Sequence, residues 1–313
     1  MLMLLDSAGL YYRAFHGVPE SITAPDGTPV NAVRGFLDMC TALVASRRPT
    51  SLVACWDDDW RPAWRVELLD SYKAHRVAAD GSEDEPDSLG AQVGIIIDVL
   101  AALGITRVGA ADYEADDVIA TLARRHARRG EQVEVVTGDR DLIQLVDDGA
   151  GIRVLYTGRG IRRMEVLDEA AVVAAHGVRP QQYCDLAIMR GDPSDGLPGV
   201  PGIGAKTAAG LLAKFDDMAG ILAAVDTGAS GLSPRLVAAL LDHRDYLARA
   251  AAVVEAADVP LPEAPTAIPA EPRDPQALAE LGQQWGLESP IERLVDALST
   301  DVPRGPSVAD GPR

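Results

Sequence analysis

Short continuous apolar runs alternate, in the first half of the chain, with longer segments whose apolar residues recur at helical spacing. Three runs have the length and continuity of buried strands, at residues 2–5, 52–56 and 133–136. Three longer segments have helical periodicity, at residues 32–46, 88–103 and 114–129. Strands that alternate with helices predict a parallel sheet with right-handed crossovers. The pattern therefore predicts an α/β fold.

The second half of the chain has a different character. From residue 168 to residue 257 the pattern is helical. Residues 260–275 contain six prolines, which predicts a linker or an extended wrap. Residues 276–298 predict one last helical region, followed by a disordered tail. We therefore expect an α/β domain, a helical subdomain and a tail, at residues 1–165, 166–299 and 300–313.

Composition narrows the setting of the protein. Of the 313 residues, 47% are hydrophobic but only 4% are aromatic, so Ala, Val and Leu must fill the core. Cys40, Cys55 and Cys184 show no pairing or zinc spacing, which is typical of thiols in a reducing cytoplasm. The apolar run at the start has no basic flank, and no segment approaches membrane-spanning length. We expect a cytoplasmic protein with no membrane partner.

The formal net charge of −18 argues at first sight against a nucleic-acid partner. The acids, however, sit in short clusters, and bound divalent cations reverse the local field of such clusters. The location of the charge therefore matters more than its sum.

Each of the three predicted strands ends at an aspartate: Asp6, Asp57 and Asp139. Ligands of open parallel sheets bind beyond the carboxyl ends of the strands, so these side chains are expected to meet. Loops favour aspartate, so one such coincidence means little, but three together indicate a site.

Six further acids extend this set. Glu114, Asp116 and Asp117 open a predicted helix, where capping by the helix dipole accounts for one acid but not for three. The rest come from two loops, at Asp141, Asp192 and Asp195. Two unit charges about 4 Å apart repel by roughly 4 kcal/mol at an effective dielectric of about 20, so nine converging carboxylates require cations. Oxygen-only ligands suit Mg²⁺ or Mn²⁺, and paired hard cations are used in phosphodiester hydrolysis.

Residues 191–208 combine this acid chemistry with a backbone-binding loop. Asp192 and Asp195 are followed by glycines that let main-chain groups approach a ligand closely. Lys206 and Thr207 open a helix whose N-terminal amides suit a phosphate. The spacing does not match a P-loop, and the chain offers no Ser/His/Asp or Cys/His set.

Taken together, these motifs resemble the 5′-nuclease (flap endonuclease) superfamily, and most closely the 5′-exonuclease domain of bacterial DNA polymerase I. The resemblance runs from residue 2 to about residue 298. The motifs that carry it are, in chain order, Asp6 with Tyr12-Arg13-Ala14-Phe15-His16, Trp56-Asp57, Tyr72-Lys73-Ala74-His75-Arg76, Tyr113-Glu114-Ala115-Asp116-Asp117, Thr137-Gly138-Asp139-Arg140-Asp141-Leu142 and residues 191–208.

The resemblance implies a PIN-like nuclease core with a helical arch at about residues 61–95 and a helix–three-turn–helix at about residues 185–225. It implies two or more Mg²⁺ or Mn²⁺ ions on all nine acids. It places Lys73 and Arg76 at the base of the arch, near the scissile phosphate. The implied DNA contacts are Tyr12, Arg13, Gly199, Gly202, Gly204, Lys206 and Thr207, with a K⁺ ion on the carbonyls of the glycine-rich loop.

The family suggests a stand-alone, monomeric 5′-3′ exonuclease and flap endonuclease that serves replication and repair at the bacterial nucleoid. Its partners would be 5′ flaps, nicks and free 5′ ends of DNA, with RNA-primed strands left open. Two departures from the family are an acidic Asp58-Asp59 pair and an acidic arch at residues 83–87. A non-catalytic module that binds branched DNA and a PIN-type ribonuclease are the alternatives, and a Mg²⁺ phosphatase is a weaker one.

Overall fold

The chain divides into two compact units, each built from segments that are far apart in sequence. The computed structural model describes residues 1–79, 81, 83, 86–228 and 231–299, so the expected tail and part of the acidic arch lie outside the described residues. The first unit comprises Met1–Leu10, Val53–Asp87 and Arg107–Ala264. The second unit comprises Tyr11–Leu52, Ser88–Thr106 and Pro265–Arg313.

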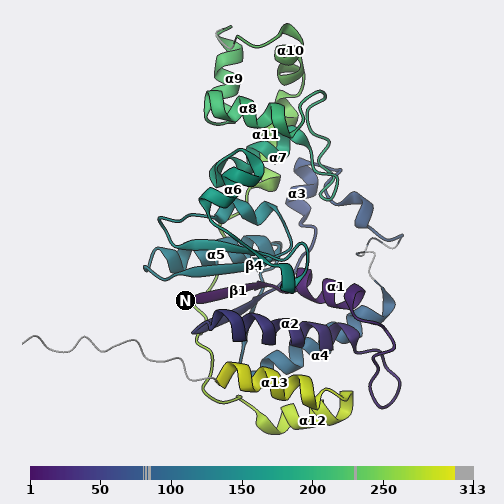
Figure 1. Cartoon of the computed structure of the whole chain (residues 1–313). Helices are drawn as coiled ribbons and strands as arrows, with labels where there is room; N and C mark the ends of the chain where they lie inside the picture. Colours follow the sequence, from purple (N-terminus) through teal and green to yellow (C-terminus); the bar gives the residue numbers. More distant parts are fainter. Residues whose placement is uncertain (80, 82, 84–85, 229–230, 300–313) are drawn as a thin grey trace, which may run out of the picture. The chain divides into compact units, whose positions relative to one another are not determined.

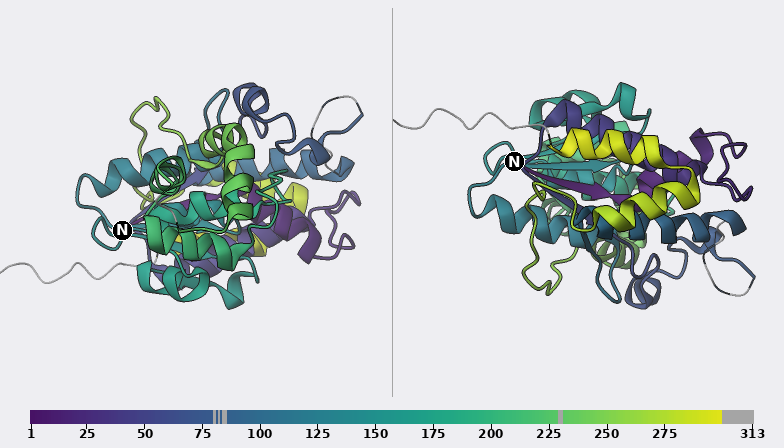
Figure 2. Two further views of the ribbon diagram at one scale, coloured as in Figure 1. Left: turned by 90° about the horizontal axis from the view of Figure 1, so that it is seen from above. Right: turned by 90° about the horizontal axis from the view of Figure 1, so that it is seen from below.

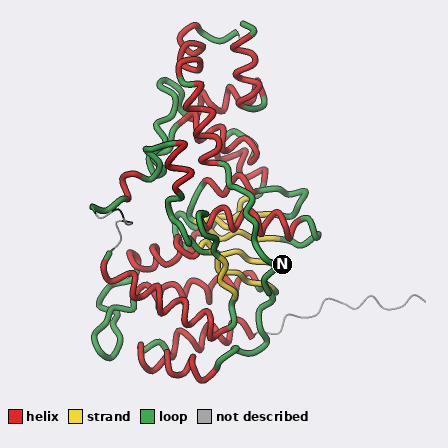
Figure 3. The backbone as a smooth tube through the Cα atoms, turned by 180° about the vertical axis from the view of Figure 1, so that it is seen from behind, coloured by secondary structure: helices red, strands yellow, loops and turns green. Residues whose placement is uncertain are grey.

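The strands form a six-stranded sheet with the order β3-β2-β1-β4-β5-β6. Figure 3 shows the strands in yellow. Their bounds are β1 Leu2–Asp6, β2 Ser51–Cys55, β3 Thr106–Val108, β4 Val133–Thr137, β5 Ile152–Tyr156 and β6 Glu165–Leu167. β1, β4 and β5 pair in parallel, whereas β6 runs antiparallel to β5. The predicted α/β fold with a parallel sheet is confirmed, and β6 adds an antiparallel strand at one edge.

The three strands that the sequence pattern missed share a physical reason. β1 and β4 are buried on both faces, which produces the continuous apolar runs that predict them. β3 and β6 are three residues long and only partly buried, and β5 places exposed Arg153 between buried neighbours. Short and half-exposed edge strands carry too little apolar signal to be found by periodicity.

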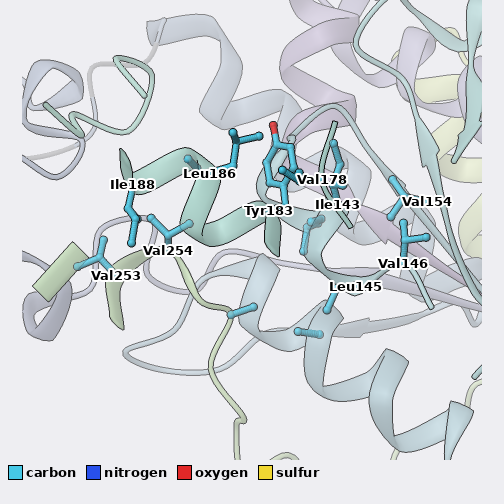
Figure 4. Packing of buried hydrophobic residues seen from close by; sticks show 14 of the residues in the cluster. Ile143, Leu145, Val146, Val154, Val178, Tyr183, Leu186, Ile188, Val253 and Val254 are labelled. Atoms are coloured by element: carbon cyan, nitrogen blue, oxygen red, sulfur yellow. The ribbon is translucent and has the colours of Figure 1, made fainter. Parts of the chain in front are cut away.

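Helix α5 (Ala115–Ala127) packs on β1 and β4 in the first unit. The remaining helices of this unit are α3 Ala63–Leu68, α6 Glu169–His176, α7 Tyr183–Arg190, α8 Ala205–Phe215, α9 Met218–Asp226, α10 Pro234–Asp242 and α11 Arg244–Val254. Helix α7 packs on α8 and α11. Figure 4 shows the core around α7, where Ile188 lies near Val253 and Val254 of α11 and Tyr183 lies near Val178.

The second unit contains α2 (Asn31–Arg47), most of α4 (Asp87–Leu103), α12 (Pro275–Trp285) and α13 (Glu288–Ser299). Helix α1 (Ser7–Gly17) begins in the first unit and continues into the second. Helix α13 runs along α2, and α12 packs beside α13 (Figures 1 and 2). The helical region expected at residues 276–298 is present as two helices, because Gly286 takes a left-handed conformation with φ 63° and ends α12.

The proline-rich segment is an extended wrap, which resolves the alternative left open by its composition. In the first unit, Arg125 donates to the carbonyl of Leu261 at 2.9 Å. In the second unit, Leu52 N donates to Thr266 O at 2.8 Å. Within the described ranges, no helix is both long and apolar enough to cross a bilayer.

Candidate metal centre

The ends of β1 and β4 hold two carboxylates in fixed positions. Asp6 accepts hydrogen bonds from Gly9 N at 3.0 Å and from Thr137 Oγ1 at 2.8 Å. Asp139 N in turn donates to Thr137 Oγ1 at 2.9 Å. Thr137 thus links the two aspartates across adjacent strands. A Cβ on Gly9 would lie 2.5 Å from Asp6 Oδ2, so this position has room only for glycine while Asp6 keeps its place.

The N-terminus of α5 supplies the next carboxylates. Asp57, which follows β2, accepts from Ala115 N at 2.7 Å and so ties the strand end to this helix. Glu114 precedes α5 and accepts from Tyr72 Oη at 2.9 Å and from Lys73 Nζ at 2.8 Å. Tyr72 appeared in the sequence only as part of a motif, whereas the structure makes it a direct partner of the acid cluster.

A small cavity joins these groups. Its volume is about 20 Å³, enough for about one water molecule or ion. The charged side chains that line it are Arg65, Lys73, Glu114, Asp116, Asp139, Asp141 and Asp195. Five of the nine predicted acids therefore face one enclosed space in the first unit.

Burial and mutual repulsion raise the pKa of several of these acids. The pKa of Asp116 is raised well above its ordinary value by burial, and next by the charges of Asp139 and Asp6. Burial and the charge of Asp139 likewise raise the pKa of Asp141, and burial raises those of Asp57 and Glu114. Such shifts mean that the charged cluster is costly without cations.

Lys73 is the cation inside this cluster. Burial alone would lower the pKa of its ammonium group, but the surrounding Tyr72, Glu114, Asp195 and Asp57 raise it well above the ordinary value. The group therefore stays protonated at neutral pH. In the described part of the chain, no three Asp, Glu, His or Cys side chains already surround one point as ligands of a single ion.

Two predicted ligands are engaged elsewhere. Asp192 pairs with Arg190 at 3.1 Å and accepts from Ser194 N at 3.0 Å, although its charge still acts on Asp141. Asp117 is fully buried in an ion pair with Arg65. The extra acids after β2 are paired locally, because Arg107 binds Asp58 at 3.1 Å and Arg61 N donates to Asp59 at 3.1 Å.

The base of the predicted arch is docked on the loop that carries Asp192 and Asp195. Lys73 N donates to Asp195 O at 3.1 Å, and Ser71 Oγ donates to Gly196 O at 2.8 Å. Arg76 donates to Ser194 O at 2.7 Å and lies 3.5 Å from Asp195 Oδ1. Three hydrogen bonds to loop carbonyls thus set the places of Lys73 and Arg76.

The glycine-rich loop separates into two parts. Gly199 is buried against the backbone of Gly191 and Arg190, and its N–H donates to Tyr246 Oη at 3.1 Å, so it closes the loop. Gly202 and Gly204 are exposed, and a Cβ on either would meet nothing within 4 Å. Lys206 and Thr207 are exposed in the first turn of α8.

Tyr12 and Arg13 lie on the part of α1 that belongs to the second unit, and both are half-buried. The structure does not place them relative to the acid cluster. Their expected contact with DNA stays a prediction.

A mostly parallel α/β sheet with clustered carboxylates at its strand ends, joined to a helical subdomain, defines a nuclease of the phosphodiester hydrolase class. Comparison with known families identifies the group within this class. Residues 1–177 match the N-terminal resolvase-like domain of the 5′-3′ exonucleases, and residues 178–276 match their C-terminal SAM fold. The chain belongs to the 5′-3′ exonuclease family, whose members hydrolyse phosphodiester bonds in DNA.

Individual relatives agree with this assignment. A 5′-3′ exonuclease of Streptomyces coelicolor is 56% identical over 95% of this chain and 100% of its own length. A 5′-3′ exonuclease of Mycobacterium tuberculosis is 48% identical over 96% of this chain and 98% of its own. DNA polymerase I of Mycobacterium bovis is 36% identical over 99% of this chain, which spans 33% of that polymerase. The predicted resemblance to the exonuclease domain of polymerase I is confirmed.

A solved structure shares the fold. The bacteriophage T5 D15 flap endonuclease, in a pseudo-enzyme-product complex with DNA and metal ions, superposes with a TM-score of 0.64 at 18% identity. The match covers 96% of this chain and 99% of that protein.

We predict that the stability of the metal-free protein depends on pH through the acid cluster. The folded protein holds protons on acids such as Asp139 at pH values where the unfolded chain, with an aspartate pKa of about 3.9, has released them. The free energy of unfolding in EDTA therefore falls as pH rises above about 4, by about 1.4 kcal/mol per pH unit for each such proton. Asp139→Asn removes one contributor and flattens this fall, as measured by urea unfolding between pH 4 and 8. Parallel curves for parent and variant would contradict the prediction.

We predict that Gly196 positions Lys73. Gly196 has φ +73°, and a Cβ there would come within 2.0 Å of Ser71 O. Gly196→Ala is therefore expected to displace the segment that carries Lys73 and to lower single-turnover cleavage by about 10²-fold, since small misplacements of reacting groups have effects of this size. The control is Gly210→Ala, where the added methyl meets open space. A folded Gly196→Ala protein that cleaves saturating substrate at the parental rate would refute the prediction.

Proposed function

We propose that this 5′-3′ exonuclease is structure-specific, cleaving 5′ flaps and free 5′ ends of DNA with Mg²⁺ or Mn²⁺ bound to its acid cluster. The observation that carries the proposal is the cavity where Glu114, Asp116, Asp139, Asp141 and Asp195 meet the ammonium group of Lys73. The bacteriophage T5 relative, a flap endonuclease seen with DNA and metal ions, supports it.

The residues present fit hard divalent cations. All the candidate ligands are carboxylates, and oxygen is the donor that Mg²⁺ and Mn²⁺ prefer. Burial, and next the charges of neighbouring acids, raise the pKa values of Asp116 and Asp141, so a bound cation would stabilise both carboxylates. Asp6, Asp57, Glu114, Asp116, Asp139, Asp141, Asp192 and Asp195 would hold two or more ions. Such ions, when bound, supply an activated water and stabilise the leaving oxygen.

Lys73 and Arg76 are proposed to contact the reacting phosphate. Lys73 Nζ donates to Glu114 Oε2 at 2.8 Å and to Trp60 O at 3.3 Å, so a phosphate oxygen would accept its third N–H or replace one of these acceptors when DNA binds. Arg76 is 35% exposed at its side chain and is held by Ser194 O, which leaves other donors of its guanidinium group for a ligand. Fixed cations aimed at developing charge contribute about 10²–10³ in rate.

The exposed part of the glycine-rich loop is proposed to grip duplex DNA. Gly202, Gly204, Lys206 and Thr207 present open backbone, one ammonium group and the amides of the first turn of α8. These are contacts to phosphate, which carry no base information, so binding is independent of sequence. A K⁺ ion on the carbonyls of this loop, and Tyr12 and Arg13 on the DNA strand, belong to the same proposal.

Cleavage of branched DNA tests the proposal directly. We expect a labelled 5′-flap duplex to be cut in Mn²⁺ or Mg²⁺ and not in excess EDTA, and a single strand of the same sequence to be cut more slowly because it offers no duplex to the loop. Lys73→Ala is expected to lower the single-turnover rate on saturating flap by about 10²-fold. Undiminished cleavage in EDTA would exclude the metal proposal, and equal rates on flap and single strand would exclude structure specificity.

A salt titration measures duplex affinity separately from cleavage. On a non-cleaved duplex, in an Asp139→Asn background, Gly204→Val is expected to weaken affinity because it adds bulk at an exposed position whose φ of −94° tolerates a side chain. Lys206→Ala is expected to lower the slope of log affinity against log salt by about one phosphate contact. Gly210→Val, further along α8 and also open, is the matched control. Parental affinity in both Gly204→Val and Lys206→Ala would show that duplex DNA binds elsewhere.

A further inference from the structure

Asp117 follows Asp116 directly, yet its environment is the opposite of that of its neighbour. Its carboxylate is 0% exposed, and four donors occupy it. Arg65 Nη2 and Ala257 N donate to Oδ1 at 2.7 and 2.8 Å. Arg65 Nη1 and Glu114 N donate to Oδ2 at 2.8 and 3.2 Å. Each oxygen therefore has two partners from the protein itself, which fills the acceptor sites that a metal would need.

Arg65 is the reason why this arrangement is stable. It comes from α3, is 2% exposed, and donates its Nε to Val253 O at 2.9 Å. Its guanidinium group also lies 3.7 Å from Glu114 Oε1. One buried ion pair thus joins three segments of the first unit: α3, the start of α5, and the end of α11 with the residues that follow it.

Helix geometry separates the two neighbours. Successive residues on an α-helix point about 100° apart, so one acid can face the cavity while the next faces away from it. Asp116 lines the cavity, whereas Asp117 does not. The sequence Glu-Ala-Asp-Asp therefore contains acids in two different environments.

We propose that Asp117 is a positioning residue and not a metal ligand. With Arg65 it forms a buried ion pair, called the strut below, that fixes the positions of Glu114 and Asp116 at the N-terminus of α5. This rests on the proposed function in one respect, because Glu114 and Asp116 are taken as the ligands that the strut positions. It removes one acid from the set of nine that the family resemblance implies.

The two roles predict opposite effects on the metal-free protein. Asp116→Asn removes a charge that its neighbours repel, so the melting temperature in EDTA is expected to rise. Asp117→Asn leaves the buried guanidinium group of Arg65 without its counter-charge, which is strongly destabilising. The melting temperature is then expected to fall, by roughly 10 °C. If Asp117 were a ligand in the repelling cluster, both substitutions would raise it.

A double variant keeps the test decisive if Asp117→Asn does not fold. Arg65→Met with Asp117→Leu removes both charges of the strut together, and replacing a buried ion pair by apolar groups of similar volume is often neutral or stabilising. We expect this variant to melt above Asp117→Asn but below the parent, because Ala257 N and Glu114 N lose an acceptor. By calorimetric titration with Mn²⁺ it is expected to bind the parental number of ions with lowered affinity, because the ion pair no longer positions Glu114 and Asp116. Asp116→Asn, the matched control, is expected to bind Mn²⁺ at least tenfold more weakly.

The outcomes are distinguishable from failure of the metal proposal itself. A double variant that loses a bound Mn²⁺ ion, or an Asp117→Asn protein that melts above the parent in EDTA, would overturn the strut. Unchanged Mn²⁺ affinity in Asp116→Asn would instead overturn the proposed metal site, while the sign of the Asp117→Asn melting shift would still decide the role of Asp117.

Discussion

The first unit depends on one constraint, which is the repulsion among carboxylates that the backbone holds close together. The strand ends of β1 and β4 and the start of α5 bring Asp6, Asp139 and Asp116 together because the backbone of a parallel sheet gives them no alternative. Hydrogen bonds from Thr137 and Gly9 hold Asp6 in this position against the repulsion. Packing of the sheet core therefore holds these carboxylates together in spite of their repulsion, and the site favours the binding of cations.

Two basic side chains each neutralise part of this negative charge, in different ways. Arg65 forms a fork with Asp117 and is closed off from solvent, so its charge is permanently committed to the fold. Lys73 is held at a single carboxylate and lies on a loop whose φ of 46° is unusual for a side chain other than glycine. A fixed guanidinium group stabilises structure, whereas an ammonium group can exchange one oxygen acceptor for another.

The sequence predicted the parts of this arrangement that depend on local pattern. Buried strands carry continuous apolar runs, so β1, β2 and β4 and the acids at their ends could be found from periodicity alone. The pairing of Asp117 with Arg65 could not, because the two residues are 52 positions apart and nothing in either segment signals the other. The same holds for Gly196, where a side chain would clash with the backbone of Ser71, 125 positions earlier. Contacts between residues that are far apart in the sequence depend on the path of the chain, so they could not be predicted from residue type.

Lysine is rare in this chain, and its positions are informative. Of 29 basic residues only three are lysines, Lys73, Lys206 and Lys214, so arginine is the default cation of this chain. Two of these three occupy the two places proposed to meet phosphate. A planar guanidinium group at position 73 could bind both oxygens of Glu114 at once. A compact ammonium group on a flexible stem makes one bond to a carboxylate oxygen and can exchange it for another oxygen. Lysine at position 73 therefore suits the proposed contact with a phosphate better than arginine would.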